Sequence, residues 1–176
     1  MTYGGKELAA SFRTVRNNTI QIAEEIPEAN YDFRAAPETR SIGQTLTHIG
    51  LLTTFQLQMQ STKVDDLAKF NFPEFQQKVG TEEAKPRTKA EVIALLRSEG
   101  EKFATFLESQ PDTFLAETVQ MPAGTQPAIK SRLEMMLSPK EHEMHHRGQL
   151  MLLQRMIGLV PHLTRERQER MAAAHR

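Results

Sequence analysis

Three helix-start signals divide this chain and favour a helical fold over any other. In each, a hydroxyl residue that can cap a helix is followed three positions later by Glu or Gln, whose side chain can bond back to the cap. The three pairs are Ser41 with Gln44, Thr88 with Glu91, and Ser138 with Glu141. Apolar residues at helical spacing follow each pair, and a further stripe of this kind runs from Lys6 to Ile26. The sequence therefore predicts an all-α fold, a four-helix bundle.

The connections between these helices are long, which favours crossovers over simple up-down hairpins. Between the second and third helices, Lys63–Arg87 is expected to form a short helix or a lid over one bundle end. Residues 110–129 are expected to be a loop with a small hairpin formed by residues 113–119 and 123–125. The pattern before Pro139 is also helical, so this proline either kinks one long helix or separates two.

Length and composition exclude several classes of protein. The 176 residues are expected to form one domain, residues 1–176, with a substantial core. Lys plus Arg and Asp plus Glu both number 22, so zero net charge removes the electrostatic basis for nonspecific binding to nucleic acid. The chain has no cysteine, so a metal site must use His, Asp, Glu or water. No apolar run approaches the roughly 20 residues of a membrane span, and no signal-peptide pattern is present. We expect a cytoplasmic protein with no membrane partner.

Histidines are concentrated in the fourth predicted helix, residues 138–157. His142 and His146 are four positions apart and therefore share a helix face. The same face carries residues of the expected core: Met135, Leu150, Leu153 and Ile157. Two histidines one turn apart can hold a metal ion between their ring nitrogens. The alternative is a pair of buried neutral histidines satisfied by hydrogen bonds. His145 lies on the flank, where it is expected to be solvated or to support a ligand.

A third inward-facing histidine, His48, lies on the second predicted helix. Its face carries Leu51, Leu52, Phe55 and Met59. His48 is either an ordinary core residue or a ligand that joins the pair on the fourth helix. Glu99 falls within the apolar face of the third helix. Because a buried carboxylate needs a partner, Glu99 either supports a metal site or acts as a base, or it turns to the bundle edge and forms a salt bridge.

The fourth helix also has a second apolar stripe, formed by Leu133, Leu137, Met144 and Met151. A helix that is apolar on two sides is deeply buried or packs against another subunit. The stripe therefore predicts a homodimer, with Gly148 permitting close approach. The alternative is that Lys63–Arg87 or the C-terminal tail covers it. The charged tail, Pro161–Arg176, is expected to be peripheral, with His162 and His175 in solvent.

Two motifs together resemble the DinB/YfiT-like superfamily. They are Ser41-Ile-Gly-Gln-Thr-Leu-Thr-His48 and Glu141-His-Glu-Met-His-His-Arg-Gly-Gln-Leu150. The resemblance covers most of the chain and implies an up-down-down-up four-helix bundle, commonly dimeric. It also implies that His48, His142 and His146 hold a divalent metal ion, zinc or nickel.

The same resemblance implies a metal-dependent enzyme with a small-molecule substrate. The reaction would be hydrolase-like, or a transfer in which a low-molecular-weight thiol attacks an electrophile, in stress or detoxification. Three neutral imidazoles leave an open coordination position, which is the arrangement of catalytic rather than structural metal sites. Gln44, Gln149 and Glu99 are candidates to orient the rings. The competing interpretation is a noncatalytic stress protein in which the metal staples the bundle or is sensed.

Overall fold

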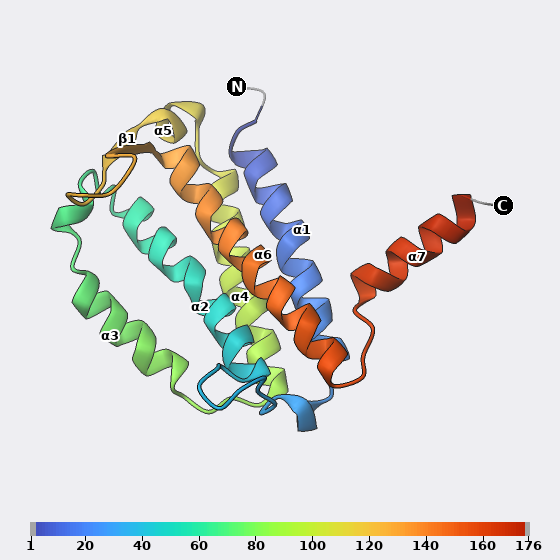
Figure 1. Cartoon of the computed structure of the whole chain (residues 1–176). Coiled ribbons are helices and arrows are strands. Elements are labelled where there is room, and N and C mark those ends of the chain that lie inside the picture. The colour runs from blue at the N-terminus through green and yellow to red at the C-terminus, as the bar shows by residue number, and fades with distance from the viewer. Residues whose placement is uncertain (1–2, 175–176) are drawn as a thin grey trace.

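Four long helices pack around a shared core in the computed structural model, which describes residues 3–174 (Figure 1). These helices are α1 (Gly5–Glu25), α2 (Ile42–Ser61), α4 (Lys89–Glu108) and α6 (Arg132–Met156). Helix α1 packs against α4 and α6, and α2 packs against the same two helices. In this arrangement the apolar stripes predicted from the sequence pack against one another in the core. The predicted all-α four-helix bundle is confirmed.

Helix α3 (Phe72–Glu83) sets the topology of the bundle. α1 and α6 run in one direction, whereas α2 and α4 run in the other (Figure 1). Two neighbouring parallel helices need a connection that returns along the length of the bundle, and α3 provides it while packing on α2. Short 3-10 turns at Glu28–Asn30 and Leu67–Lys69 complete the loops before α2 and α3. The result is the predicted up-down-down-up bundle with long crossovers.

Hydrogen bonds confirm two of the three predicted helix starts. At α2, the Ser41 Oγ accepts from the Gln44 N–H at 3.2 Å, and the Gln44 Oε1 accepts from the Ser41 N–H at 3.1 Å. At α4, the Thr88 Oγ1 accepts from the Glu91 N–H at 3.3 Å, and a Glu91 carboxylate oxygen accepts from the Thr88 N–H at 2.8 Å. Both are reciprocal caps, so the local sequence alone decides where these helices begin.

The third predicted start, at Ser138, is wrong. Helix α6 begins at Arg132, where the Ser131 Oγ accepts from the Glu134 N–H at 3.1 Å, and the helix continues through Pro139. A proline inside a helix costs about 3 kcal/mol, because a backbone hydrogen bond is lost and the ring crowds the preceding turn. Burial on both sides of Pro139 offsets that cost: Met136 is 1% exposed and Leu150 is fully buried. Tertiary packing therefore overrides the local stop signal.

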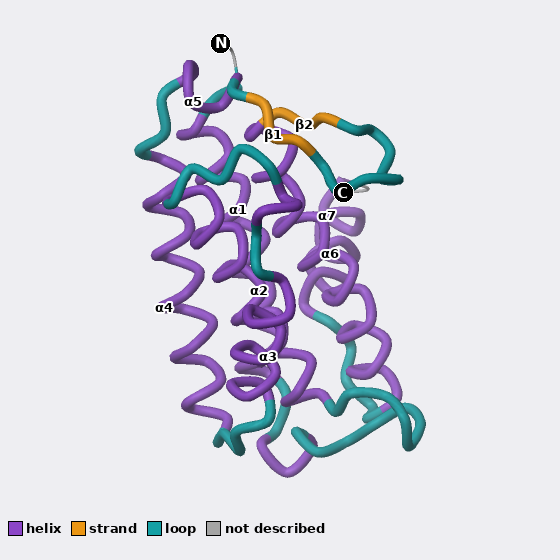
Figure 2. The backbone as a smooth tube through the Cα atoms, turned by 90° about the vertical axis from the view of Figure 1, so that its left-hand side faces the viewer, coloured by secondary structure: helices purple, strands orange, loops and turns teal. Residues whose placement is uncertain are grey.

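The connection between α4 and α6 covers one end of the bundle (Figure 2). It contains helix α5 (Asp112–Ala116) and an antiparallel pair of strands, β1 (Thr118–Gln120) and β2 (Ile129–Ser131). A hairpin was predicted here, but residues 113–116 are helical and the second strand lies after residues 123–125. Phe114 and Leu115 are adjacent and both buried. Because a strand points neighbouring side chains to opposite faces, only a helical turn lets both enter the core here.

The C-terminal tail forms helix α7 (His162–Ala174), which extends away from the bundle (Figure 1). Most of α7 is exposed, so its peripheral position is confirmed. The expectation that His162 is in solvent is wrong, because the start of α7 packs on α1 and leaves this residue only 1% exposed. His175 lies outside the described residues. Between residues 3 and 174, every helix is too short or too polar to span a bilayer.

The outer face of α6 differs in part from the predicted apolar stripe. Leu133, Leu137 and Met151 are half-buried against the core, whereas Met144 is 45% exposed. The exposed apolar side chains follow one another four positions apart, and this outer face comprises Met144, Gly148, Leu152 and Met156. A Cβ atom at Gly148 would meet no atom within 4 Å among the described residues. Association of two copies through this face stays a prediction.

Candidate metal centre

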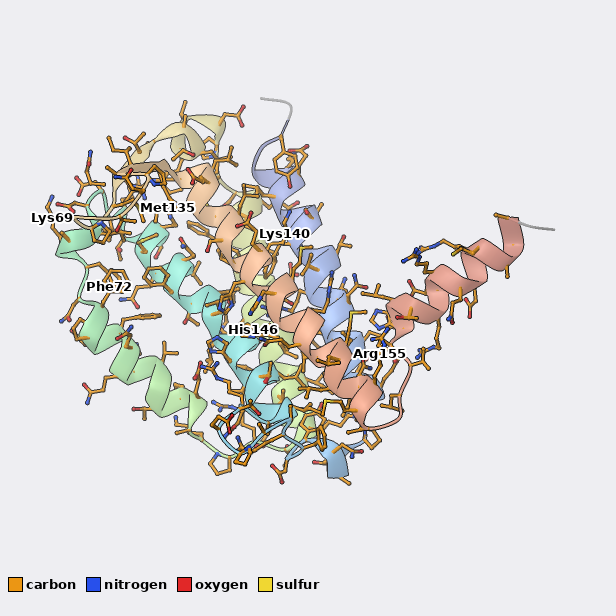
Figure 3. All side chains as sticks on the ribbon, viewed as in Figure 1. Lys69, Phe72, Met135, Lys140, His146 and Arg155 are labelled. Atoms are coloured by element: carbon orange, nitrogen blue, oxygen red, sulfur yellow. The ribbon has the colours of Figure 1, made fainter. Side chains whose placement is uncertain are left out.

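The structure brings together the three histidines that the sequence singled out. His48 lies two turns into α2, and His142 and His146 lie on the side of α6 that packs against α2. Figure 3 labels His146 near the middle of the bundle, well away from either end of α6. The triad forms here because both helices place these residues on core-facing stripes that meet across the interface between α2 and α6.

The three imidazoles lie close enough to share one ion. The ring centroids are 5.3 Å apart for His48 and His142, 5.0 Å for His48 and His146, and 4.4 Å for the pair on α6. One ring nitrogen from each residue lies within 4.8 Å of the other two. No other group of three or more His, Asp or Glu residues among residues 3–174 has this geometry. A single divalent cation is thus within reach of all three after small side-chain rotations.

Two polar side chains fix the orientation of the rings. The Nδ1 of His48 contacts a carboxylate oxygen of Glu83 at short range, and the Nδ1 of His146 lies 2.7 Å from the Oε1 of Gln149. In both pairs the ring N–H at Nδ1 donates to an oxygen, so in the neutral form of each ring Nε2 is the nitrogen that can bind a metal. This arrangement of an oxygen acceptor behind a histidine is common at metal sites.

His142 has a different environment. Its Nδ1 is one of the few buried side-chain atoms among the described residues that have no hydrogen-bond partner. Leaving a buried polar atom unsatisfied costs free energy of about 1–3 kcal/mol, so such atoms in a folded protein call for an explanation. The donor set, three imidazole nitrogens with the buried Nδ1 of His142 unsatisfied, fits a divalent transition metal such as zinc or nickel.

Burial holds these histidines in the protonation state that binds metal. Burial lowers the pKa of His142 to about 4, and the charges of the neighbouring histidines and of Arg40 act in the same direction. Burial also lowers the pKa of His146, although its hydrogen bond with Gln149 acts in the opposite direction. Both rings are therefore neutral at neutral pH, as a metal ligand must be.

Other predicted supporting residues have different roles. Gln44 caps α2. Glu99 forms a salt bridge of 2.6 Å with Lys102 at the bundle edge, which is the second of the two alternatives given for it. Gln149 contacts His146, as expected of a residue that orients a ring. His145 is exposed, with its Nε2 3.3 Å from the amide nitrogen of Gln149, so it lies beside the triad without joining it.

Two carboxylates near the triad, those of Glu83 and Glu143, were not predicted from the sequence. Glu83 comes from the crossover helix α3, 35 positions from His48, and no periodicity links the two residues. Glu143 follows His142 in the sequence of α6 but has a different partner. It is 1% exposed, and its Oε2 forms a 3.0 Å ion pair with the Nη2 of Arg16 on α1. A signal for Glu143 was present, since Arg16 lies within the apolar stripe of the first helix and needs a partner there.

Two cavities have residues of the triad in their walls. One, of about 320 Å³, lies between α2 and α3 and has His48 in its wall. The other, of about 630 Å³, lies beside the loop before α2 and has His146 and Gln149 in its wall. Arg40 lines both cavities. His48 and His146 are thus accessible to small molecules.

Comparison with known proteins agrees with this fold. A sequence model of the DinB superfamily matches residues 11–150. The chain belongs to this superfamily. A DinB relative, the uncharacterised protein YjoA of Bacillus subtilis, is 26% identical over 152 residues, which are 86% of this chain and 90% of YjoA.

Solved structures of DinB-like proteins have the same fold. The structure of YjoA superposes with a TM-score of 0.64 over 86% of this chain and 92% of its own, at 19% identity. A DinB-like protein of Bacillus cereus gives 0.67 over 88% and 93%, at 18% identity. YfiT of Bacillus subtilis, described as "a probable metal-dependent hydrolase with an unusual four-helix bundle topology", gives 0.66 over 88% of each chain, at 13% identity.

Proposed function

We propose that this chain is a metal-dependent enzyme that holds one divalent ion, zinc or nickel, through His48, His142 and His146. The observation that carries the proposal is the convergence of three inward-facing histidines, with one ring nitrogen from each within 4.8 Å of the others. The three residues come from two helices, and no other described residue completes a fourth protein ligand. An incomplete protein ligand set is typical of catalytic rather than structural sites.

The chain's own residues prepare the site for chemistry. Glu83 and Gln149 hold two rings so that Nε2 points away from their hydrogen bonds, and burial lowers the pKa of His142 and of His146, which keeps these two rings neutral. When bound, a divalent cation supplies Lewis acidity that lowers the pKa of a water or thiol in contact with it. The two cavities give a small molecule access to His48 and to His146.

The proposed reaction is the attack of an activated nucleophile on a small electrophilic substrate. With water as the nucleophile the enzyme is a hydrolase, in line with the description of YfiT. With a low-molecular-weight thiol it is an S-transferase. The chain contains no cysteine, so the thiol would come from a cosubstrate. Both reactions fit a role in stress or detoxification.

The alternative is a noncatalytic protein in which the metal staples α2 to α6 or is sensed. A staple needs a closed site shielded from solutes, as in structural zinc sites with four protein ligands. Here His48 and His146 each line a cavity, and the His48 side chain retains 17% exposure. This accessibility favours the enzyme.

The first test is elemental analysis of protein purified without chelators or a histidine tag. We expect about one divalent ion per chain, as at single-metal sites with three histidines. His48→Ala and His146→Ala should lose the metal, whereas the control His145→Ala should keep it, because His145 is exposed beside the triad. Helical content by circular dichroism should be unchanged in all three.

Two results would reject the proposal. Full metal retention in His48→Ala or His146→Ala would exclude the triad as the site. Absence of metal from the wild-type protein, with no uptake of added zinc or nickel, would leave three core histidines and no basis for metal-dependent catalysis. A positive result would justify screening electrophiles with water and with low-molecular-weight thiols, with the metal-free variant as the blank.

A further inference from the structure

The cavity between α2 and α3 has an apolar end and a charged end. Its apolar wall is formed by Leu51, Leu52, Phe55, Phe75 and Val79. Its charged end contains Arg40 and Glu83, and His48 of the triad lies at the same end. The volume of about 320 Å³ is within the range of small-molecule sites.

Helix α3 leaves this space unfilled because it packs loosely. None of its residues is fully buried, although Phe75 and Val79 face α2 and are half-buried. Gly80 also lines the cavity, and a Cβ atom at this position would meet nothing within 4 Å. An amphipathic helix normally buries its apolar face in full. Here that face instead covers a space that an apolar group can occupy.

Arg40 is available to bind an anion at the charged end. Its side chain is 48% exposed, and its one ion-pair partner within residues 3–174 is Glu83, at 3.8 Å. That contact, to Oε2, is long, and the other oxygen of the same carboxylate, Oε1, is engaged by His48. A guanidinium has five N–H donors and pairs with carboxylate or phosphate through two parallel hydrogen bonds. Arg40 forms no hydrogen bond with any other described residue, so its donors are free for a ligand.

We propose that the site takes a small amphipathic anion, with its carboxylate or phosphate bound to Arg40 and its apolar part in the cavity between α2 and α3. The inference rests on the proposed function, since it names the class of substrate for that site. The geometry places the junction of the two parts of the ligand beside His48, next to the metal centre. Glu83 lies beside the guanidinium and lowers the local positive charge, so the anionic group has to contact Arg40 directly to gain from its charge.

The test measures binding of phenylbutyrate and of its neutral match, phenylbutyramide, by isothermal titration calorimetry. The protein is used as purified and again after chelation, with metal content determined on the same samples. Arg40→Gln removes the charge, Arg40→Lys keeps the charge without the paired donors, and Arg97→Gln removes an exposed charge from α4 as a control. Gly80→Phe fills the cavity, with Gly80→Ala as its control.

Phenylbutyrate should bind the wild-type protein and the Arg97→Gln and Gly80→Ala controls alike. Arg40→Gln should weaken binding by about tenfold or more, as expected for loss of a charged hydrogen-bonded pair. The affinity of Arg40→Lys for phenylbutyrate should lie between those of the wild-type and Arg40→Gln proteins, and Gly80→Phe should abolish binding. Phenylbutyramide should bind the wild-type protein about as weakly as phenylbutyrate binds Arg40→Gln.

Equal affinity of wild-type and Arg40→Gln protein would overturn the assignment of Arg40. So would equal affinity for the acid and the amide, or unchanged binding in Gly80→Phe. If binding is lost on chelation but is unaffected by Arg40→Gln, the metal holds the anion, and the proposal also fails. Metal content is an independent readout: Arg40→Gln should keep its metal, so failure of the metal site and failure of this inference are distinguishable.

Discussion

Replacement of Glu143 by Gln is expected to destabilise the fold by about 3–5 kcal/mol, the cost of leaving a buried charge without its partner. The Glu143 and Arg16 side chains are only 1% and 4% exposed, and Nη2 and Oε2 are 3.0 Å apart. The guanidinium also donates to the Leu96 carbonyl at 2.7 Å and to the Ile49 carbonyl at 3.2 Å. These bonds hold Arg16 between helices, so it cannot reach solvent when its carboxylate partner is lost.

The size of the effect follows from the stability of domains of this length. Total stabilities are about 5–15 kcal/mol, so the loss is a large fraction of the whole. Each kcal/mol shifts the melting temperature by about 2–4 °C in a chain of this size, which predicts a fall of roughly 6–20 °C. Because the Arg16–Glu143 pair joins α1 to α6 beside His142, the same change is expected to loosen the metal site.

Urea unfolding followed by circular dichroism measures the change, and an exposed ion pair between α1 and α4 provides the control. Arg13 and Glu101 pair at 2.7 Å but are 33% and 61% exposed, so Glu101→Gln should cost about 0–1 kcal/mol. The double variant Arg16→Met with Glu143→Leu should recover most of the loss, because it removes both buried charges. The reasoning is refuted if Glu143→Gln costs no more than Glu101→Gln, or if the double variant is as unstable as the sum of its single changes.

Two further predictions concern pH and assembly. Burial lowers the pKa of His142 from 6.5 to about 4, so the unfolded chain binds a proton that the folded chain does not between these pH values. The free energy of unfolding of chelated protein, measured by urea titration, should therefore fall as the pH drops through this window. The His142→Asn variant should show a smaller fall. An equal fall in both proteins would show that His142 is not the group that titrates. If the outer face of α6 joins two copies, the double variant Met144→Glu with Met156→Glu should sediment as a monomer, since both side chains are about half exposed. A dimer that persists in this variant would exclude the outer face as the interface.

The local sequence determined the helices and the direction in which the key histidines point. Reciprocal caps at Ser41 and Thr88 act within four residues, so no distant contact is needed to place α2 and α4. The helical period then sets which residues share a face, and this put His48, His142 and His146 on core-facing stripes. Both results depend only on neighbours along the chain, which is why they were predictable.

Only the tertiary structure decided which local start and stop signals are overridden and which residues distant in the sequence come into contact. Ser138 and Pro139 carry a start signal and a stop signal, yet burial on both sides of the proline keeps α6 continuous. Glu83 reaches His48 because the crossover helix α3 returns along α2, and Arg16 reaches Glu143 across 127 positions. Such pairings depend on how helices pack in space, and the packing energy of many residues outweighs the preference of a few.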